Sequence, residues 1–271
     1  MRIQEMGPEL YAGMEARVSR RKYTAAPSAE ELAELARYAA ELNRDADGAV
    51  RIGVWADGAE EVFGGLTNSY GMFSGVRAFA GFIGRSGGDG ERTGVLCGYY
   101  GEQFILKATA MGLGTCWVAG TFDKSMARRI AGVNEGETLY CVSPLGAVPE
   151  ALGLRERLVK GFSAKRSRKP LADLLASPEA LAAAPAWMAS ALESARIGPS
   201  AMNAQPWRFR LAPDRKAVTA YLASHPAAKR VDLGIALAHI EIAALQAGVR
   251  GVWTEGEEPH AWTFQAEEER R

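Results

Sequence analysis

Ser200, Asn203 and Gln205 stand close together in one short run of the sequence and carry one hydroxyl and two amides. An amide both donates and accepts hydrogen bonds, and a hydroxyl can do either. Because Pro206 disfavours a helical backbone in the residue before it, we expect Gln205 to be extended and the run to form a stiff loop. Such a loop suits a flat heteroaromatic ligand with alternating donors and acceptors on its rim. The same residue types are also common in loops that bind nothing, so composition alone leaves both interpretations open.

Two short basic segments supply side chains that could bind an anion: Arg17, Ser19, Arg21, Arg166 and Arg168. Guanidinium groups match phosphate oxygens in geometry and charge, and a serine hydroxyl adds a neutral donor. Both segments could instead be solvated, the first at the end of a short helix and the second in a linker. No aromatic residues are interleaved with the second segment, which argues against nucleic-acid binding.

The periodicity of the flanking segments predicts the elements that must position these side chains. Residues 186–197 are apolar and rich in alanine, and they predict a helix that Gly198 and Pro199 end. Residues 207–211 predict a strand, so the polar loop lies between a helix and a strand. Further helices are expected at 29–43, 98–112 and 124–131, and further strands at 50–55, 76–85 and 139–146, with another strand opened by Trp117. Residues 57–75 fit either a loop or an irregular helix.

The other residues capable of chemistry fit structural roles. His239 lies within an apolar segment and is expected to be a buried core histidine, and Asp232 is expected to cap that helix. Cys97, Cys116 and Cys141 lack the spacing of metal ligands and are expected to be reduced thiols. We therefore predict no metal site.

The composition narrows the class of protein. The chain has 271 residues, 48% of them hydrophobic, and a formal net charge of +0, so its overall charge indicates neither a nucleic-acid nor an anionic-membrane partner. No apolar run approaches the ~20 residues needed to span a bilayer. Residues 1–6 lack the apolar core of a signal peptide. We expect a cytoplasmic protein.

Four positions of one long apolar segment recur at constant spacing in a second: Gly98, Ala108, Gly112 and Trp117 correspond to Gly234, Ala244, Gly248 and Trp253. A duplication explains the correspondence better than the alternative, a coincidence over a single segment. It divides the chain into halves at 1–175 and 176–271. The basic segments belong to the first half and its end, and the polar loop belongs to the second. We therefore expect one ligand site, at the interface between the halves.

The motifs in these segments together resemble the FMN-dependent nitroreductase superfamily. P-S-x-x-N-x-Q-P-W at 199–207 is similar to its flavin loop, R-x-S-x-R at 17–21 to its opening motif, and R-x-R at 166–168 to its closing basic pair. Val18 departs from the pattern, because the family has a second arginine there. The chain resembles in particular the branch of putative TM nitroreductases, in which two halves are fused into one polypeptide.

The resemblance implies a role for each matching residue. Contacts with the phosphate or ribityl chain of FMN fall on Arg17, Ser19, Arg21, Arg166 and Arg168. The flavin ring would contact Pro199, Ser200, Asn203 and Gln205. The backbone N–H groups of Ala119 and Gly120 would lie beside flavin N5 and O4. No side chain is expected to act as a catalytic acid, base or nucleophile, because the flavin carries the chemistry.

The resemblance also implies the fold and the activity. The fold would be α+β, a mostly antiparallel sheet with helices on both sides that occurs twice, so that a monomer mimics the homodimer of the family. Two long apolar helices would form the seam. The activity would be transfer of a hydride from NAD(P)H through FMN to a small electron acceptor such as a nitroaromatic or a quinone. Two alternatives stay open: a non-catalytic FMN-binding or storage protein, and a structural pseudo-dimer without flavin.

Overall fold

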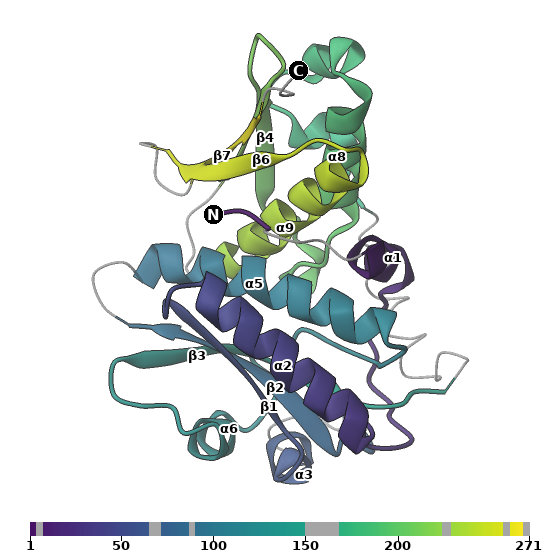
Figure 1. The fold of residues 1–271 in the computed structure, drawn as a ribbon, viewed down its shortest axis with the longest axis vertical. Coiled ribbons are helices and arrows are strands. Elements are labelled where there is room, and N and C mark those ends of the chain that lie inside the picture. The colour runs from purple at the N-terminus through teal and green to yellow at the C-terminus, as the bar shows by residue number, and fades with distance from the viewer. Residues whose placement is uncertain are drawn as a thin grey trace.

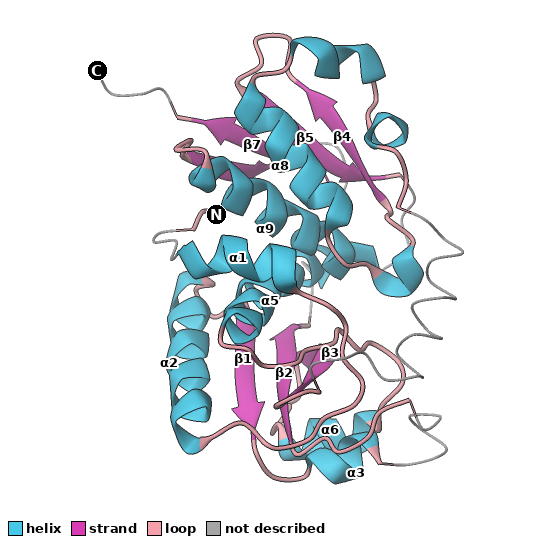
Figure 2. Ribbon diagram, turned by 90° about the vertical axis from the view of Figure 1, so that its right-hand side faces the viewer, coloured by secondary structure: helices cyan, strands magenta, loops and turns pink. Residues whose placement is uncertain are grey.

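The computed structural model describes residues 1–3, 8–64, 72–86, 90–149, 168–223, 229–256 and 261–267. These residues fold into two antiparallel sheets with a layer of helices between them (Figure 1). Figure 2 shows that layer from the side; it contains α1 (Pro8–Ala16), α5 (Gly90–Ala110) and α9 (Arg230–Gln246).

The first sheet is covered on both faces. It contains β1 (Val50–Trp55), β2 (Ala78–Arg85) and β3 (Glu137–Leu145), which pair antiparallel in that order. The helices around it are α5, α2 (Ala29–Asp45), α3 (Ala59–Phe63) and α6 (Lys124–Ile130). Phe82 of β2 packs edge-on against Phe104 of α5, and Phe79 packs against Phe63 of α3. Both faces of β2 are therefore buried.

The second sheet is covered on one face in its described part. It contains β4 (Trp207–Leu211), β5 (Ala217–Leu222), β7 (Ala261–Ala266) and β6 (Gly251–Glu255), paired antiparallel in that order. α8 (Ala186–Ile197) and α9 lie against the covered face, where Trp187 contacts Phe264 of β7. Buried and more exposed residues alternate along β4 and β6, which is typical of a sheet with one solvated face.

Local signals account for most element boundaries. Ser28 and Glu31 form the expected capping box at the start of α2, and α8 and β4 have the predicted bounds. Short 3-10 helices occur at η1 (Leu171–Leu174), η2 (Pro178–Ala183) and η3 (Ala201–Asn203). The strand predicted to open at Trp117 is wrong: the segment after α5 makes only isolated bridges, such as Val118 with Val142. α5 also begins at Gly90, earlier than the predicted residue 98.

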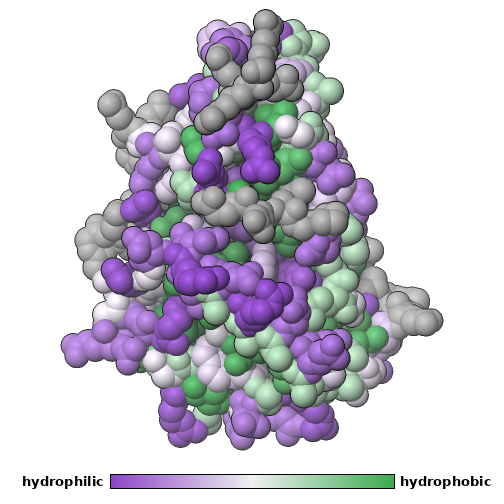
Figure 3. Space-filling view, in the orientation of Figure 1, coloured by the Kyte–Doolittle hydropathy of each residue, from purple (hydrophilic) through white to green (hydrophobic). Residues whose placement is uncertain are grey.

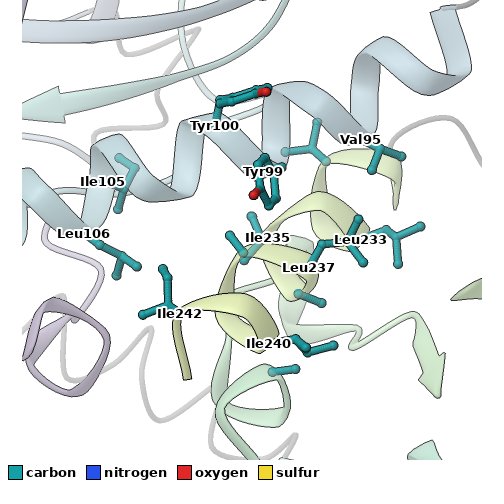
Figure 4. Packing of buried hydrophobic residues seen from close by; sticks show 14 of the residues in the cluster. Val95, Tyr99, Tyr100, Ile105, Leu106, Leu233, Ile235, Leu237, Ile240 and Ile242 are labelled. Atoms are coloured by element: carbon teal, nitrogen blue, oxygen red, sulfur yellow. The ribbon is translucent and has the colours of Figure 1, made fainter. Parts of the chain in front are cut away.

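α5 and α9 cross at two glycines. A Cβ atom added to Gly98 would lie 2.0 Å from the carbonyl oxygen of Val231, and one added to Gly234 would lie 1.9 Å from that of Val95. These distances are far below van der Waals contact, so only glycine lets the two backbones approach so closely. Apolar side chains of both helices interdigitate around the crossing (Figure 4): Tyr99, Ile105, Leu106, Leu233, Ile235 and Leu237. The two long apolar helices pack directly on each other, as predicted.

Segments of the predicted first half also pair with the second sheet. Leu175, the last residue of the predicted first half, forms a parallel bridge with Phe209 of β4. Met1 and Trp253 exchange two backbone hydrogen bonds, each of 2.8 Å. The strand orders of the two sheets differ as well. The division at residue 175 and the internal duplication therefore stay predictions.

Candidate functional site

The loop between α8 and β4 is fixed by its own polar groups. The Gln205 N–H donates to the Ser200 hydroxyl at 3.0 Å, and the Gln205 side-chain amide donates to the carbonyl of Asn203 at 3.1 Å. Its amide oxygen accepts the Lys169 N–H at 2.8 Å, and the residue is only 1% exposed. Gln205 thus locks the loop. Ser200 closes the loop through its hydrogen bond with Gln205, and its side chain does not cap η3.

Three residues of this loop have left-handed backbones: Met202 with φ 54, Asn203 with φ 53 and Gln205 with φ 47. The expectation that Pro206 holds Gln205 extended is therefore wrong, because the hydrogen bonds from Ser200, Asn203 and Lys169 outweigh the local preference. A left-handed residue other than glycine costs roughly 1–2 kcal/mol. Strain that is held in place by surrounding contacts clusters at functional sites, which singles out this loop.

Arg168 joins the second basic segment to the loop. Its guanidinium donates to the carbonyl of Ile197 at 2.8 Å and to that of Gly198, the last carbonyls of α8. Burial lowers the pKa of Arg168 to about 10, and the nearby charges of Arg17 and Arg196 add to the effect. Among the described residues no carboxylate pairs with Arg168. A partly buried guanidinium beside two others, with no carboxylate partner in the described part of the chain, suits an anionic ligand.

Arg17 and Ser19 lie in the same cluster of side chains as Arg168 and Arg196. A guanidinium nitrogen of Arg17, Nη1, donates to the Ser19 hydroxyl at 3.4 Å, and Nε lies 4.0 Å from Glu102 Oε1. The Arg17 side chain is 10% exposed, and within the described part of the chain this is its one hydrogen bond. Most of its donors therefore stay available to a ligand. Arg21 lies further along the segment, where its carbonyl accepts the Ser74 N–H at 3.0 Å.

Three predicted contacts lie apart from this cluster or outside the described residues. Ala119 and Gly120 form an exposed bend after the bridge between Val118 and Val142. Space is open around Gly120, since no heavy atom lies within 4 Å of where a Cβ would stand. Their backbone N–H groups are thus accessible. Arg166 lies outside the described residues.

A buried carboxylate, Glu102 of α5, connects several of these segments. Its Oε2 accepts the indole N–H of Trp117 at 2.7 Å, and its Oε1 lies 2.9 Å from Nε2 of His239. Nδ1 of His239 lies 2.9 Å from the carbonyl oxygen of Ser194 on α8. His239 is buried with both ring nitrogens bonded, as predicted for a core histidine. Sequence analysis missed Glu102, although an acidic residue inside an otherwise apolar helix is a recognisable signal.

Asp232 also has a role that the sequence did not indicate. α9 begins at Arg230, so Asp232 lies in its first turn and does not cap it. The carboxylate instead accepts the Ala201 N–H at 2.9 Å and so anchors the strained loop. Its other oxygen, Oδ2, is buried and has no partner among the described residues. Burial raises the pKa of Asp232 to about 7.

Exposed apolar side chains gather on the same segments. On the face drawn in Figure 3, hydrophobic residues form small groups among hydrophilic ones. In the described ranges the large hydrophobic residues with high exposure are Val18, Ile197 and Met202, and Met202 is 80% exposed. Each stands within or beside a predicted site motif. The site therefore combines cationic groups with an apolar border.

Other places in the fold offer less chemistry. A surface cavity of about 540 Å³ lies beside Arg51 and Glu137 on the first sheet, but these two side chains already pair with each other at 2.7 Å. The described residues contain no group of His, Cys, Asp or Glu that could hold a metal ion, and the three cysteines are buried and free. No helix in the described ranges is long and apolar enough to cross a membrane.

The residues present fit the flavin mononucleotide that the motifs imply. Its phosphate needs cations with donors that no described residue occupies, which Arg17 supplies, and a second positive charge nearby, which Arg168 supplies. Its ring needs hydrogen-bonding groups on a fixed backbone. Ser200 meets that need, because its hydroxyl accepts from Gln205 and no described residue takes its proton.

Known proteins share the fold of this chain. Among solved structures, a putative nitroreductase from Thermotoga maritima has a TM-score of 0.60 at 18% identity and covers 98% of this chain and 97% of its own, which shows a common fold. A putative NADH dehydrogenase/NAD(P)H nitroreductase from Parabacteroides distasonis has a TM-score of 0.43 at 17% identity, covering 54% of this chain and 91% of its own. A putative NADH oxidase from Clostridium acetobutylicum has a TM-score of 0.42 at 15% identity, covering 52% and 89%. These two similarities are too weak to show a common fold.

A search of the curated proteins found no match. The model of the family described as Putative TM nitroreductase, by contrast, matches residues 9–244. That range contains the basic segments, the helix crossing and the polar loop. Because the match spans most of the sequence, the chain belongs to the putative TM nitroreductase family.

Proposed function

We propose that this chain is an FMN-dependent oxidoreductase that transfers a hydride from NAD(P)H to a small electron acceptor such as a nitroaromatic or a quinone. Membership of a nitroreductase family supports an oxidoreductase, because nitroreductases generally bind a flavin and use NAD(P)H. The observation that carries the proposal is the meeting of Arg17 and Arg168 beside the polar loop, where Arg168 is partly buried and no described carboxylate pairs with it.

The chain's own residues would bind and orient the cofactor. Arg17, Ser19 and the second basic segment hold the phosphate, and phosphate binding relieves the repulsion between the guanidinium groups. Ser200 donates to the ring, while Arg168 and Gln205 keep the loop in place. Once bound, FMN supplies the redox chemistry by accepting a hydride and passing it on. We also retain Arg21, Arg166, Pro199, Asn203, Ala119 and Gly120 as proposed contacts.

The apolar border supports the choice of acceptor. Val18, Ile197 and Met202 expose hydrophobic surface beside the proposed ring site. A planar nitroaromatic or quinone would bury that surface, whereas a highly charged acceptor would not. We further propose that the protein is a cytoplasmic monomer with one FMN, placed between two halves that mimic a homodimer.

Titration of FMN into the purified apo-protein, followed by flavin fluorescence, tests the proposal. Arg17→Gln should weaken binding at least tenfold, because a hydrogen bond to a charged group contributes about 1.5–3 kcal/mol. Arg37→Gln is the matched control, since Arg37 lies on the exposed face of α2 and pairs with Glu34 and Glu41. Equal losses in the two variants, or no loss in Arg17→Gln, would contradict the proposal.

Oxidation of NAD(P)H by the FMN-loaded protein, with nitrofurazone or menadione as acceptor, separates the alternatives. Turnover above that of free FMN supports the enzyme. Bound FMN without such turnover supports a binding or storage protein. A protein that cannot be reconstituted with FMN supports a flavin-free pseudo-dimer.

A further inference from the structure

The Glu102 carboxylate is the point at which separate segments of the proposed flavin site meet. Arg17 approaches Oε1 to 4.0 Å, His239 approaches it to 2.9 Å, and Trp117 donates to Oε2 at 2.7 Å. Each neighbour belongs to a different part of the site. Arg17 is in the phosphate motif, Trp117 stands two residues before Ala119, and His239 leads to α8.

His239 carries the contact on to the polar loop. Its Nδ1 lies 2.9 Å from the carbonyl oxygen of Ser194 in the last turn of α8, and its ring carbons lie within 3.7 Å of where a Cβ on Gly198 would stand. Gly198 is the residue whose carbonyl accepts from Arg168. One chain of contacts thus runs from Arg17 through Glu102 and His239 to the start of the loop.

The hydrogen-bond partners of His239 and Glu102 limit where the hydrogens of these two side chains lie. The carbonyl of Ser194 can only accept, so Nδ1 of His239 carries a hydrogen. One further proton lies between Nε2 and Oε1, on either His239 or Glu102. The Trp117 N–H donates to Oε2 and the Arg17 guanidinium approaches Oε1, so both oxygens of the carboxyl group have neighbours that hold them in place.

A stabilising role alone does not account for this arrangement. Glu102 is 0% exposed and His239 is 1% exposed, so both groups have lost their water. A buried ion pair is often no more stable than apolar residues of similar volume, because desolvation offsets the attraction. The pair instead fixes relative positions: Glu102 on α5 contacts His239 on α9 and Arg17 after α1, and His239 contacts the Ser194 carbonyl on α8.

We propose that Glu102 is a positioning residue for the flavin site: its buried carboxyl group binds His239 and Trp117 and orients Arg17 toward the cofactor phosphate. The inference rests on the proposed function. Through Trp117 and Ser194 the same pair keeps the exposed bend and the polar loop in fixed relation. Glu102 acts through these neighbours and does not itself contact the cofactor.

Glu102→Gln tests the proposal, because glutamine keeps the volume and can still accept from Trp117 while donating to a neutral His239. An amide nitrogen would then face Arg17 in place of Oε1, so the contact that orients the guanidinium is lost. FMN affinity should fall about ten- to a hundredfold, by analogy with the loss of metal affinity when a hydrogen-bond partner of a metal ligand is removed. Glu241→Gln is the matched control: Glu241 is buried on α9, but it bonds to Tyr99 and Ile3, away from the site motifs. That control should bind FMN as the wild type does.

The ¹⁵N NMR signals of the His239 ring give a second readout that a merely structural role would not move. The Nε2 signal should change in Glu102→Gln and stay as in the wild type in Glu241→Gln. An unchanged Nε2 signal in Glu102→Gln would overturn the contact between the two side chains. Should Glu102→Gln fail to fold, Trp117→Phe removes the indole N–H, keeps a smaller aromatic ring beside Phe82 and should also weaken FMN binding.

The outcomes separate this role from the proposed function. A wild-type protein that binds no FMN overturns the proposed function and this role with it. Normal wild-type binding, with unchanged binding by a folded Glu102→Gln, overturns the positioning role alone. Equal losses in Glu102→Gln and Glu241→Gln also overturn it, because the effect would then be general to buried carboxylates.

Discussion

Replacement of Gly234 by alanine should destabilise the protein at the crossing that holds its two sheets together. The added Cβ would lie 1.9 Å from the Val95 carbonyl oxygen, 2.6 Å from the Tyr99 nitrogen and 2.9 Å from the Gly98 Cα. All three atoms belong to the backbone of α5, so no side chain can rotate to make room. The helices must move apart, and the interdigitated apolar residues of Figure 4 lose contact.

The magnitude follows from two opposing effects. Overpacking a well-packed core costs about 1–3 kcal/mol, and the clash with rigid backbone places this variant at the upper end. Alanine recovers about 1 kcal/mol through its higher helix propensity. We therefore expect a net loss of about 2 kcal/mol in the free energy of unfolding.

Urea denaturation of the wild type, Gly234→Ala, Gly98→Ala and the double variant measures this loss. Both single variants should be less stable, and the double variant should lose less than the sum, because both methyl groups separate the same helices. Gly256→Ala is the control: its Cβ would meet its nearest neighbour at 3.4 Å, an ordinary contact. A Gly234→Ala protein as stable as the wild type would refute the close crossing.

Three further predictions concern the site. Met202→Gly should raise the free energy of unfolding by about 1 kcal/mol, since it relieves a left-handed backbone at an exposed position; thermal denaturation showing a loss would refute the strain. The pKa of Asp232 is raised to about 7 in the folded protein, so the native state holds the proton more tightly and stability should fall as pH rises from about 4 to 7. Asp232→Asn should remove its share of this loss in the free energy of unfolding, on the order of 4 kcal/mol at most. A further share is due to Glu241, whose pKa burial also raises to about 7. An unchanged pH dependence in urea titrations would count against the buried carboxylate. Arg168→Lys should weaken FMN binding, because a lysine cannot donate in a planar fork to the carbonyls of both Ile197 and Gly198; unaltered FMN affinity would contradict this role.

Local sequence signals were sufficient for the elements that flank the site. The alanine-rich run ended by Gly198 and Pro199 predicted α8, and the run that Trp207 opens predicted β4. These elements are determined by residues close together in the sequence. Helix-forming residues followed by a helix breaker predict a helix, and alternating β-branched or aromatic residues predict a strand. The antiparallel sheets and the apolar helix pair were predicted from the family resemblance, and the structure contains both.

The details that sequence reasoning missed depend on distant contacts. Gln205 is left-handed because Lys169 and Ser200 hold it, against the preference that Pro206 imposes. Asp232 accepts from Ala201, a residue on another element, and so does not cap its own helix. Glu102 contacts His239 only because α5 packs on α9 and brings the two side chains together. No periodicity or motif encodes such pairings.

The most direct measurement of the central claim is the amount of flavin that each chain retains after reconstitution with FMN and gel filtration, read from the visible absorption spectrum. A site built jointly by the basic segments and the polar loop predicts one FMN per chain. A colourless protein, or two flavins per chain, would contradict it.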